Sequence, residues 1–332
     1  MPAPLRLGLL GCGDIAARRT LPALARTPGA ALAAVAARDP ARAASFAARF
    51  GGEPAASYEE LLARPDVDAV YLCLPTMLHA HWAGRALEAG KHVLVEKPLA
   101  TNGADARRLF ALAGRRNLVL LENFMFLHHA AQRTVAGLLG SGVLGTVRAV
   151  SAAFTIPPRP DGDTRYDPAL GGGALLDNGV YPLRAALRFL GTDLTVAGAV
   201  LRQDERRGVD LSGAALLAAP GGATAQVRWG MEHHYRSWYE IQGSAGALSV
   251  EHVYTAAPDR SPVVRVRTGT EVRELRVPAE DHFEAVLAFF AAAVAAASRG
   301  AERPGLPLLD AESRRQAGLL DEVRRAALRV SA

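Results

Sequence analysis

The chain has 332 residues, of which 50% are hydrophobic and 21% charged, with a formal net charge of +5. This balance is typical of a globular enzyme of two domains, and the 38 basic residues form no block interleaved with aromatics, so we expect no nucleic-acid partner. No apolar run reaches the roughly 20 residues that span a bilayer, and the N-terminus lacks a signal-peptide pattern, so we expect no membrane partner. With only two cysteines, Cys12 and Cys73, we expect a cytoplasmic location.

The first 124 residues alternate short apolar runs with helical patterns. We expect strands over 5–11, 31–38, 68–75, 92–98 and 118–124, with helices near 15–26, after Asp39-Pro40, near 57–64, and over 77–89 and 103–115. Asp39 and Pro40 suit the N-cap and the first position of a helix. Apolar strands that alternate with helices predict a parallel sheet covered on both faces. Residues 1–124 are therefore expected to form a doubly wound α/β Rossmann domain.

The grouping of strands and helices changes after residue 125. A helix is expected over 130–140, a strand over 146–157, an ordered loop over 157–173 and a helix over 174–190. Several alternating strands follow between 194 and 277, and alanine-rich helices over 281–298 and 310–328 close the chain. Strands grouped together predict an α+β domain with a largely antiparallel sheet, over residues 125–332.

The stretch "GCGDIA" (11–16) follows the first expected strand and opens the first helix. Gly11 permits a tight turn, Gly13 lets the backbone approach a pyrophosphate, and Ala16 replaces the third glycine of the dinucleotide-binding pattern. A helix N-terminus favours anions, so we expect Gly11, Gly13, Asp14 and Ile15 at a dinucleotide cofactor. The alternative is a structural turn without a ligand.

The end of the second strand indicates which cofactor is used. NAD enzymes usually place an acidic residue there to bind the ribose 2′-hydroxyl. This chain has Arg38 followed by Asp39, and Asp39 is accounted for as the helix N-cap. Arg38 can bind a 2′-phosphate, so we expect NADP(H) to be preferred over NAD(H). The alternative is that Arg38 is a solvated charge.

Two further strand ends carry candidate residues. "LPTMLHAHW" (74–82) begins where doubly wound domains bind ligands, so Leu74, Thr76 and His79 are expected at the cofactor, with a capping or surface role as the alternative for the histidine. "VEKP" (95–98) places Lys97 before Pro98, which favours an extended backbone and a projecting side chain. All but two of the 38 basic residues are arginine, and this bias favours a function for Lys97.

The stretch "LGGGALLDNGVYPL" (170–183) holds the candidate residues of the second half. Three glycines allow close backbone approach, and Asp177 and Tyr181 share one face if the segment is helical. Pro182 either kinks that helix or begins a second segment. Asp177 and Tyr181 by themselves also fit a buried hydrogen-bonded pair without chemistry.

In this order, "GCGDIA", "EKP" and "GGGALLDNGVYPL" resemble the glucose–fructose oxidoreductase / inositol dehydrogenase / rhizopine catabolism (Gfo/Idh/MocA) family of NAD(P)-dependent sugar oxidoreductases. The resemblance covers essentially the whole chain. It implies that a Rossmann domain precedes a substrate-binding domain whose open sheet mediates oligomerisation, and hence a homo-oligomer (dimer or tetramer). It places catalytic roles on Lys97, Asp177 and Tyr181, although many members have histidine at the last position.

A narrower similarity lies in "LLENFMFLHHAAQRTV" and "FTIPPRPDGDTRYDPALGGGALLDNGVYPLR". These stretches resemble nucleotide-sugar 3-ketoreductases of deoxysugar and antibiotic biosynthesis. The resemblance implies an enzyme that uses NADPH to reduce the 3-keto group of a nucleoside-diphosphate (dTDP-type) keto-deoxysugar, without a metal. The residues it implies at the substrate are Lys97, Asn123, Phe124, Arg165, Tyr166, Asp177 and Tyr181.

Carbonyl reduction needs a proton donor and a group that stabilises negative charge on oxygen. We expect Tyr181 to donate the proton and Lys97 to polarise the carbonyl and lower the pKa of the tyrosine. Asp177 would orient the sugar and Glu96 would contact the nicotinamide side, while Arg165 is expected to bind the diphosphate or to form a loop salt bridge. The alternatives are a free-sugar or trans-dihydrodiol dehydrogenase, and a non-catalytic NADP-binding regulator.

Overall fold

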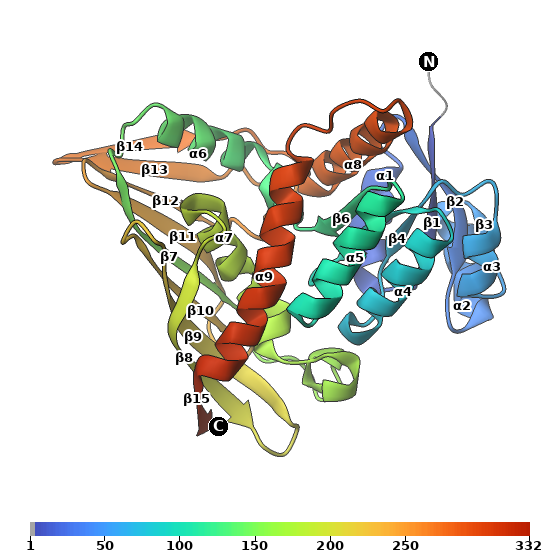
Figure 1. Ribbon diagram of the computed structural model, residues 1–332, viewed down its shortest axis with the longest axis horizontal. Coiled ribbons are helices and arrows are strands. Elements are labelled where there is room, and N and C mark those ends of the chain that lie inside the picture. Colours follow the sequence, from blue (N-terminus) through green and yellow to red (C-terminus); the bar gives the residue numbers. More distant parts are fainter. Residues whose placement is uncertain (1–3) are drawn as a thin grey trace. The chain divides into compact units, whose positions relative to one another are not determined.

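A computed structural model describes residues 4–332 of the chain (Figure 1). By their contacts these residues divide into two compact units, which are described separately below. The first unit comprises the chain up to Ala100, Ala104–Phe124 and His282–Ser313, and the second comprises Thr101–Gly103, Met125–Asp281 and Arg314–Ala332. Residues 282–313, which follow the sequence-based boundary at 124, thus pack with the first unit.

The first unit is built on a six-stranded sheet in which every pairing is parallel. The order β3-β2-β1-β4-β5-β6 is the doubly wound order, which confirms the predicted Rossmann fold. The central strands are apolar and buried because helices cover both faces. The strands are β1 (Leu5–Leu10), β2 (Ala30–Ala36), β3 (Glu53–Pro54), β4 (Ala69–Leu72), β5 (His92–Glu96) and β6 (Leu120–Asn123).

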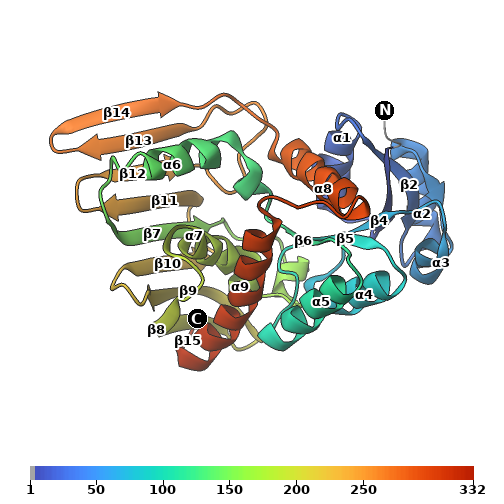
Figure 2. The ribbon, with the colours of Figure 1, turned by 45° about the horizontal axis from the view of Figure 1, so that its top comes forward.

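Helices flank this sheet on two sides: α4 and α5 lie on one side, and α1 and α8 on the other (Figure 2). Asp39 caps α2 by accepting the backbone N–H of Ala41, as predicted. The expected helix over 15–26 begins instead with a π-helical segment, η1. The helices are η1 (Ala16–Thr20), α1 (Leu21–Leu24), α2 (Pro40–Phe50), α3 (Tyr58–Ala63), α4 (Thr76–Glu88), α5 (Gly103–Arg115) and α8 (His282–Ser298).

The second unit is built on a nine-stranded sheet with the order β14-β13-β12-β11-β7-β10-β9-β8-β15. Its pairings are antiparallel except for β7 with β10 and β8 with β15, so the predicted, largely antiparallel sheet is confirmed. The strands are β7 (Val147–Thr155), β8 (Thr195–Asp204), β9 (Val209–Ala218), β10 (Thr224–Gly230), β11 (Arg236–Gly243), β12 (Ala247–Glu251), β13 (Val263–Thr268), β14 (Glu271–Arg276) and β15 (Ala327–Ser331).

Helix α7 (Val180–Leu190) packs on β7, β10 and β11 and covers one face of this sheet. On β8 and β9 exposure alternates, with Leu201 and Leu217 buried and Val200 and Leu216 exposed on the opposite face. The remaining helices are η2 (Met125–His128), α6 (Ala130–Gly140), η3 (Thr164–Tyr166), η4 (Pro168–Leu170), η5 (Leu175–Gly179) and α9 (Leu306–Ala326), of which the residues up to Ser313 belong to the first unit. Within residues 4–332, no helix combines the length and the apolar character that a membrane span requires.

Candidate functional site

The glycine turn after β1 is shaped by the neighbouring strand β4. Gly11 has φ +91°, and a Cβ there would collide with the carbonyl oxygen of Cys73. A Cβ on Gly13 would lie 2.5 Å from the Cys73 Sγ. Both glycines therefore let the turn lie against β4. The glycine turn leads directly into a helix, and a helix N-terminus favours an anionic ligand.

The side chains of Asp14, Cys12 and Cys73 surround the glycine turn. Asp14 is exposed and pairs with Arg18 at 2.6 Å, whereas the two cysteines are buried. Burial raises the pKa of Cys12 to about 11 and that of Cys73 to about 12. Both therefore remain thiols near neutral pH and act as packing groups beneath the turn.

Arginines gather where β2 meets α2. Arg38 is exposed directly after β2, and Arg42 extends from the first turn of α2 back to the glycine turn. Its Nε and Nη2 atoms donate to the carbonyl oxygen of Cys12 at 2.9 and 2.7 Å. The sequence did not single out Arg42, although its position in the first turn of the helix that follows the second strand was an available signal.

His79 connects two loops at the carboxyl edge of the sheet. Its Nδ1 and Nε2 atoms lie 2.8 Å from the carbonyl oxygens of Pro98 and Leu74, respectively. The ring is 1% exposed, and this burial lowers its pKa. Leu74 and Thr76, at the start of α4, are partly exposed. His79 is thus positioned to hold the loop before α4 against the Lys97-Pro98 segment.

Glu96 ends β5, and its Oε1 atom accepts hydrogen bonds from the hydroxyl of Tyr71 and the Nδ2 of Asn123, both at 2.7 Å. Lys97 follows and is partly exposed. Asn123 and Phe124 are each 0% exposed. In the first unit, the structure thus brings together the predicted residues Glu96 and Asn123 at one edge, directly before the lysine.

In the second unit, the structure brings together Arg165 and Asp177. The Arg165 Nε donates to the Asp177 Oδ2 at 2.7 Å, and its Nη1 donates to the Asp163 Oδ1 at 3.1 Å. The negative charge of Asp177, followed by that of Asp163, raises the pKa of Arg165. Tyr166 lies beside this pair in η3, where its hydroxyl accepts the backbone N–H of Arg159 at 3.1 Å.

The run of glycines before η5 allows two close approaches. A Cβ on Gly172 would lie 2.5 Å from the carbonyl oxygen of Arg165, and one on Gly173 would lie 2.5 Å from the Asp210 Oδ1. Gly173 also has φ +115°, which is unfavourable for other residues. The glycines therefore let the loop that carries Arg165 lie against the helical turn that carries Asp177.

Tyr181 lies in the first turn of α7 and is 3% exposed. Its ring contacts Phe154 and Tyr254, with centroid distances of 4.9 and 5.4 Å. These contacts fix the ring direction, so the position of the hydroxyl is set by the core. The expected single helix is a π-helical turn, η5, that continues into α7, and Pro182 is accommodated near this junction.

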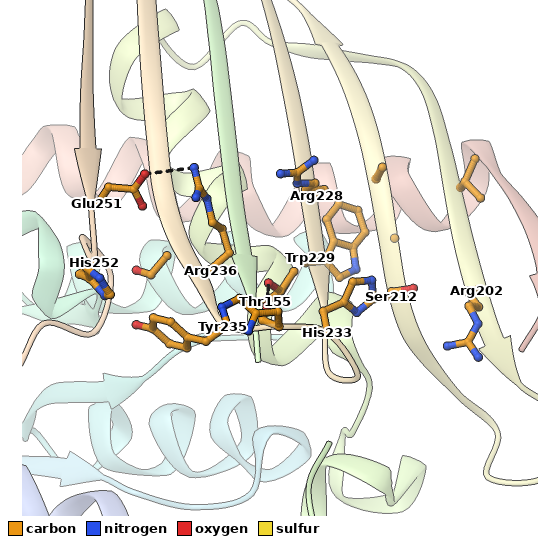
Figure 3. Close-up of a pocket in the computed structure, with 15 residues that line it drawn as sticks. Thr155, Arg202, Ser212, Arg228, Trp229, His233, Tyr235, Arg236, Glu251 and His252 are labelled. Carbon is orange, nitrogen blue, oxygen red and sulfur yellow. Dashed lines mark hydrogen bonds and ion pairs between the residues drawn. The ribbon is translucent and has the colours of Figure 1, made fainter. Parts of the chain in front are cut away.

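A wide pocket of about 920 Å³ lies on sheet B, the nine-stranded sheet (Figure 3). Its charged lining includes Arg202, Arg228 and Arg236, and Arg236 pairs with Glu251 at 3.1 Å. It contains none of the residues that the sequence singled out. Among residues 4–332, no cluster of His, Cys, Asp or Glu is arranged to hold a metal ion.

Comparisons with known proteins agree with this architecture. Residues 5–124 match the model of an oxidoreductase family with an NAD-binding Rossmann fold, and residues 132–249 match the GFO/IDH/MocA C-terminal domain. A dTDP-3,4-didehydro-2,6-dideoxy-α-D-glucose 3-reductase of Actinomadura kijaniata is 50% identical over 98% of this chain and 96% of its own.

Similarity extends to solved structures and to more distant relatives. The crystal structure of a 3-ketoreductase from Actinomadura kijaniata with NADP and TDP-benzene has a TM-score of 0.93 at 49% identity, over 99% of each chain. A trans-1,2-dihydrobenzene-1,2-diol dehydrogenase of Macaca fuscata fuscata is 31% identical over 96% of this chain and 94% of its own. With both family models matched and half the residues shared with a relative over nearly the full length, the predicted resemblance is confirmed, and the chain belongs to the GFO/IDH/MocA family of oxidoreductases.

Proposed function

We propose that this oxidoreductase reduces the 3-keto group of a dTDP-linked keto-deoxysugar with NADPH, as a step of deoxysugar biosynthesis in antibiotic production. The observation that carries the proposal is the 47–50% identity to four relatives, all named dTDP-3,4-didehydro-2,6-dideoxy-α-D-glucose 3-reductase. Since the identity extends over both units, it supports the substrate class as well as the cofactor.

The residues of the first unit fit nicotinamide adenine dinucleotide phosphate, NADP(H). The glycine turn, at the N-terminus of a helix, would hold the pyrophosphate, and Gly11, Gly13, Asp14 and Ile15 would lie beside it. Such a cofactor supplies a hydride when bound. Arg38 would pair with the 2′-phosphate, and Arg42 would add positive charge while it holds the glycine turn.

The remaining proposed cofactor contacts lie along the carboxyl edge of the sheet. Leu74 and Thr76 would contact the ribose and nicotinamide, and Glu96 with Lys97 would border the nicotinamide. His79 would act indirectly, by fixing the two loops whose carbonyl oxygens it faces.

On the substrate, Tyr181 would donate the proton to the developing alkoxide and Lys97 would stabilise its negative charge. Solved structures of the Actinomadura kijaniata 3-ketoreductase include variants with a lysine or a tyrosine replaced, and these two are separated along that chain by as many residues as Lys97 and Tyr181 are here. This equal spacing supports catalytic roles for both residues.

Asp177 would orient the sugar, and its ion pair with Arg165 favours a positioning role for the arginine. A diphosphate would have to compete with two carboxylates for the Arg165 guanidinium. We therefore favour the salt-bridge alternative for Arg165 over direct diphosphate binding. Asn123, Phe124 and Tyr166 would shape the sugar site.

The decisive experiment compares substrates. Purified protein would be mixed with NADPH and a dTDP-linked 3-keto-deoxysugar, and NADPH oxidation would be followed by absorbance. Underivatised sugars and trans-dihydrodiols with NADP⁺ would test the second candidate function, which the diol dehydrogenase relative favours. Turnover of the nucleotide sugar alone supports the proposal, whereas turnover of the free substrates alone supports a sugar or diol dehydrogenase. Binding of NADPH with no turnover of either would favour the regulator.

The proposal extends to the roles of the two domains, the oligomeric state and the cellular location. Residues 1–124 would form the cofactor domain, with residues 282–313 packed on it, and the rest of residues 125–332 would form the domain for substrate and for oligomerisation as a dimer or tetramer. The uncovered face of sheet B, with its exposed Val200 and Leu216, supports self-association. The two free cysteines suit a reducing cytoplasm. Sedimentation velocity would test the oligomeric state.

A further inference from the structure

A chain of four side chains lies beneath the carboxyl edge of the six-stranded sheet. Thr20 of η1 is within 3.0 Å of the Tyr71 hydroxyl, which lies 2.7 Å from the Glu96 Oε1. Asn123 approaches the same oxygen at 2.7 Å. Thr20, Tyr71 and Asn123 are each 0% exposed. The network thus links a covering helix to three adjacent strands.

Strand register explains why these side chains meet. Tyr71 of β4 pairs with Leu94 of β5, and Glu96 lies two residues further along β5, hence on the same face of the sheet. Asn123 of β6 pairs directly with Glu96. The parallel sheet therefore aligns the three polar groups in one row, directly before Lys97.

The chemistry of the groups fixes the direction of each hydrogen bond. An ionised carboxylate only accepts, so the single proton of the Tyr71 hydroxyl is donated to Glu96. Thr20 must then donate to the Tyr71 oxygen. Burial, followed by the charge of Glu96, raises the pKa of Tyr71 well above its usual value, so the tyrosine remains a donor over the working pH range.

Two acceptor atoms remain at the end of this network. Within residues 4–332, the hydrogen bonds to the Glu96 carboxylate from Tyr71 and Asn123 both reach Oε1, which leaves Oε2 available. The Oδ1 of Asn123 is buried and has no hydrogen-bond partner within residues 4–332. A buried acceptor without a donor is costly, and the carboxamide of a nicotinamide carries two N–H donors. The residues therefore fit this end of the cofactor.

We propose that Tyr71 is a positioning residue: together with Asn123 it fixes the Glu96 carboxylate so that its second oxygen accepts an N–H from the nicotinamide carboxamide. This inference rests on the proposed cofactor. The phenol holds the carboxylate in one rotamer, because a flexible glutamate otherwise loses side-chain entropy on binding. Tyr71 thus acts through Glu96 and touches no substrate.

The test is Tyr71→Phe, which removes the hydroxyl but keeps the buried ring. NADPH affinity would be measured by fluorescence, and the affinity of 2′,5′-ADP, which lacks the nicotinamide, by calorimetry. We expect NADPH binding to weaken about tenfold, the scale of one hydrogen bond to a charged group, while 2′,5′-ADP binding stays unchanged. Thr20→Val, which leaves Tyr71 in place, should weaken NADPH binding in the same direction but by less.

A matched control is Tyr239→Phe on β11. It removes a buried hydroxyl that donates a hydrogen bond to Gln132 at 3.2 Å. It should lower thermal stability without changing either affinity. Parent-like NADPH binding in both Tyr71→Phe and Thr20→Val, or an equal loss of 2′,5′-ADP binding, would overturn the inference. These outcomes leave the proposed reductase intact, whereas a parent protein that fails to bind NADPH would overturn both.

Discussion

At the scale of single residues, the two lysines lie in different environments. Lys91 is 9% exposed, and its Nζ donates to the carbonyl oxygens of Arg64 and Val67 at 2.7 and 2.8 Å. Lys97 is partly exposed at the end of β5. At Lys91 a compact ammonium serves these two structural contacts. The composition alone did not distinguish such a structural role from the catalytic role proposed for Lys97.

Lys97→Arg tests the catalytic need. A guanidinium keeps the positive charge but is larger and planar, so it would misplace that charge by about 1 Å, which can cost on the order of 10²-fold in rate. We expect turnover to fall by at least about that factor with NADPH binding retained. Lys91→Arg is the control and should lower the melting temperature while turnover stays near the parent value. Normal turnover in Lys97→Arg would remove the lysine from the mechanism.

Tyr181→Phe tests the proton donor. The ring contacts with Phe154 and Tyr254 remain in this variant, so the fold should be retained. Loss of a general acid should lower turnover by roughly 10²–10⁴, with NADPH affinity unchanged. Steady-state rates at saturating NADPH would measure this. A variant with full activity would transfer the proton donation to another group.

Arg38→Asp tests cofactor choice. Replacing the cation by an anion should weaken NADPH binding at least about tenfold through loss of an ion pair and new repulsion, and should favour NADH. Arg49→Asp makes the same charge change near the end of α2, where Arg49 lies over the Phe50 ring, and should leave the preference intact. Fluorescence titration with NADPH and NADH would measure the affinities. Equal losses of NADPH affinity in the two variants would mean that the net charge of the protein, and not the position of Arg38, determines the preference.

The candidate site residues that the sequence suggests are those carried by local motifs. The glycine turn, Lys97, Asp177 and Tyr181 were proposed from short patterns that a single sequence displays, whereas contacts set by packing leave no such pattern. Tyr71 reads as an ordinary apolar strand residue, and its contact with Glu96 depends on the register of two strands. Such register is fixed by the whole sheet.

At the scale of elements, the strong periodicities gave accurate boundaries. The helices over 103–115 and 130–140 begin and end where the sequence predicted. Two π-helical segments, η1 and η5, were not foreseen, because an inserted residue does not disturb an alanine- or leucine-rich pattern. The C-terminal ALRVS segment was assigned in part to a helix but forms β15, since pairing with β8 outweighs its local preference.

The glycine turn allows a test of why Gly13 is a glycine. A Cβ there would lie 2.5 Å from the Cys73 Sγ, so Gly13→Ala should lower stability, and adding Cys73→Ala should restore most of it. A coupling of about 1–3 kcal/mol is expected for directly contacting residues, measured by urea unfolding of the two single variants and the double variant. If the losses of unfolding free energy in the two single variants simply add in the double variant, the proposed clash between the Cβ introduced by Gly13→Ala and the Cys73 Sγ is contradicted. NADPH affinity of the stable double variant would then report separately on pyrophosphate access.

At the scale of the whole molecule, we expect three partly or fully buried histidines to make folding sensitive to acid. Burial lowers the pKa of His92 to about 4 and that of His128 to about 3, and it also lowers the pKa of His129. The Nδ1 atoms of His92 and His129 accept the backbone N–H groups of Val119 and Ala131. A protonated ring nitrogen cannot accept, so these hydrogen bonds require neutral rings.

We therefore expect the free energy of unfolding to decrease as the pH falls from about 6.5 towards 4.5. In this window an unfolded histidine, with a pKa near 6.5, takes up a proton that the folded one does not, so acid favours the unfolded chain by up to about 1.4 kcal/mol per histidine and pH unit. His129→Asn keeps a side-chain cap for α6 without a titrating ring and should flatten the profile. Urea unfolding at several pH values would measure the slopes of the parent and of the variant. An equally steep profile in His129→Asn would mean that other groups cause the acid sensitivity, because the cap is preserved and only the titrating ring is lost.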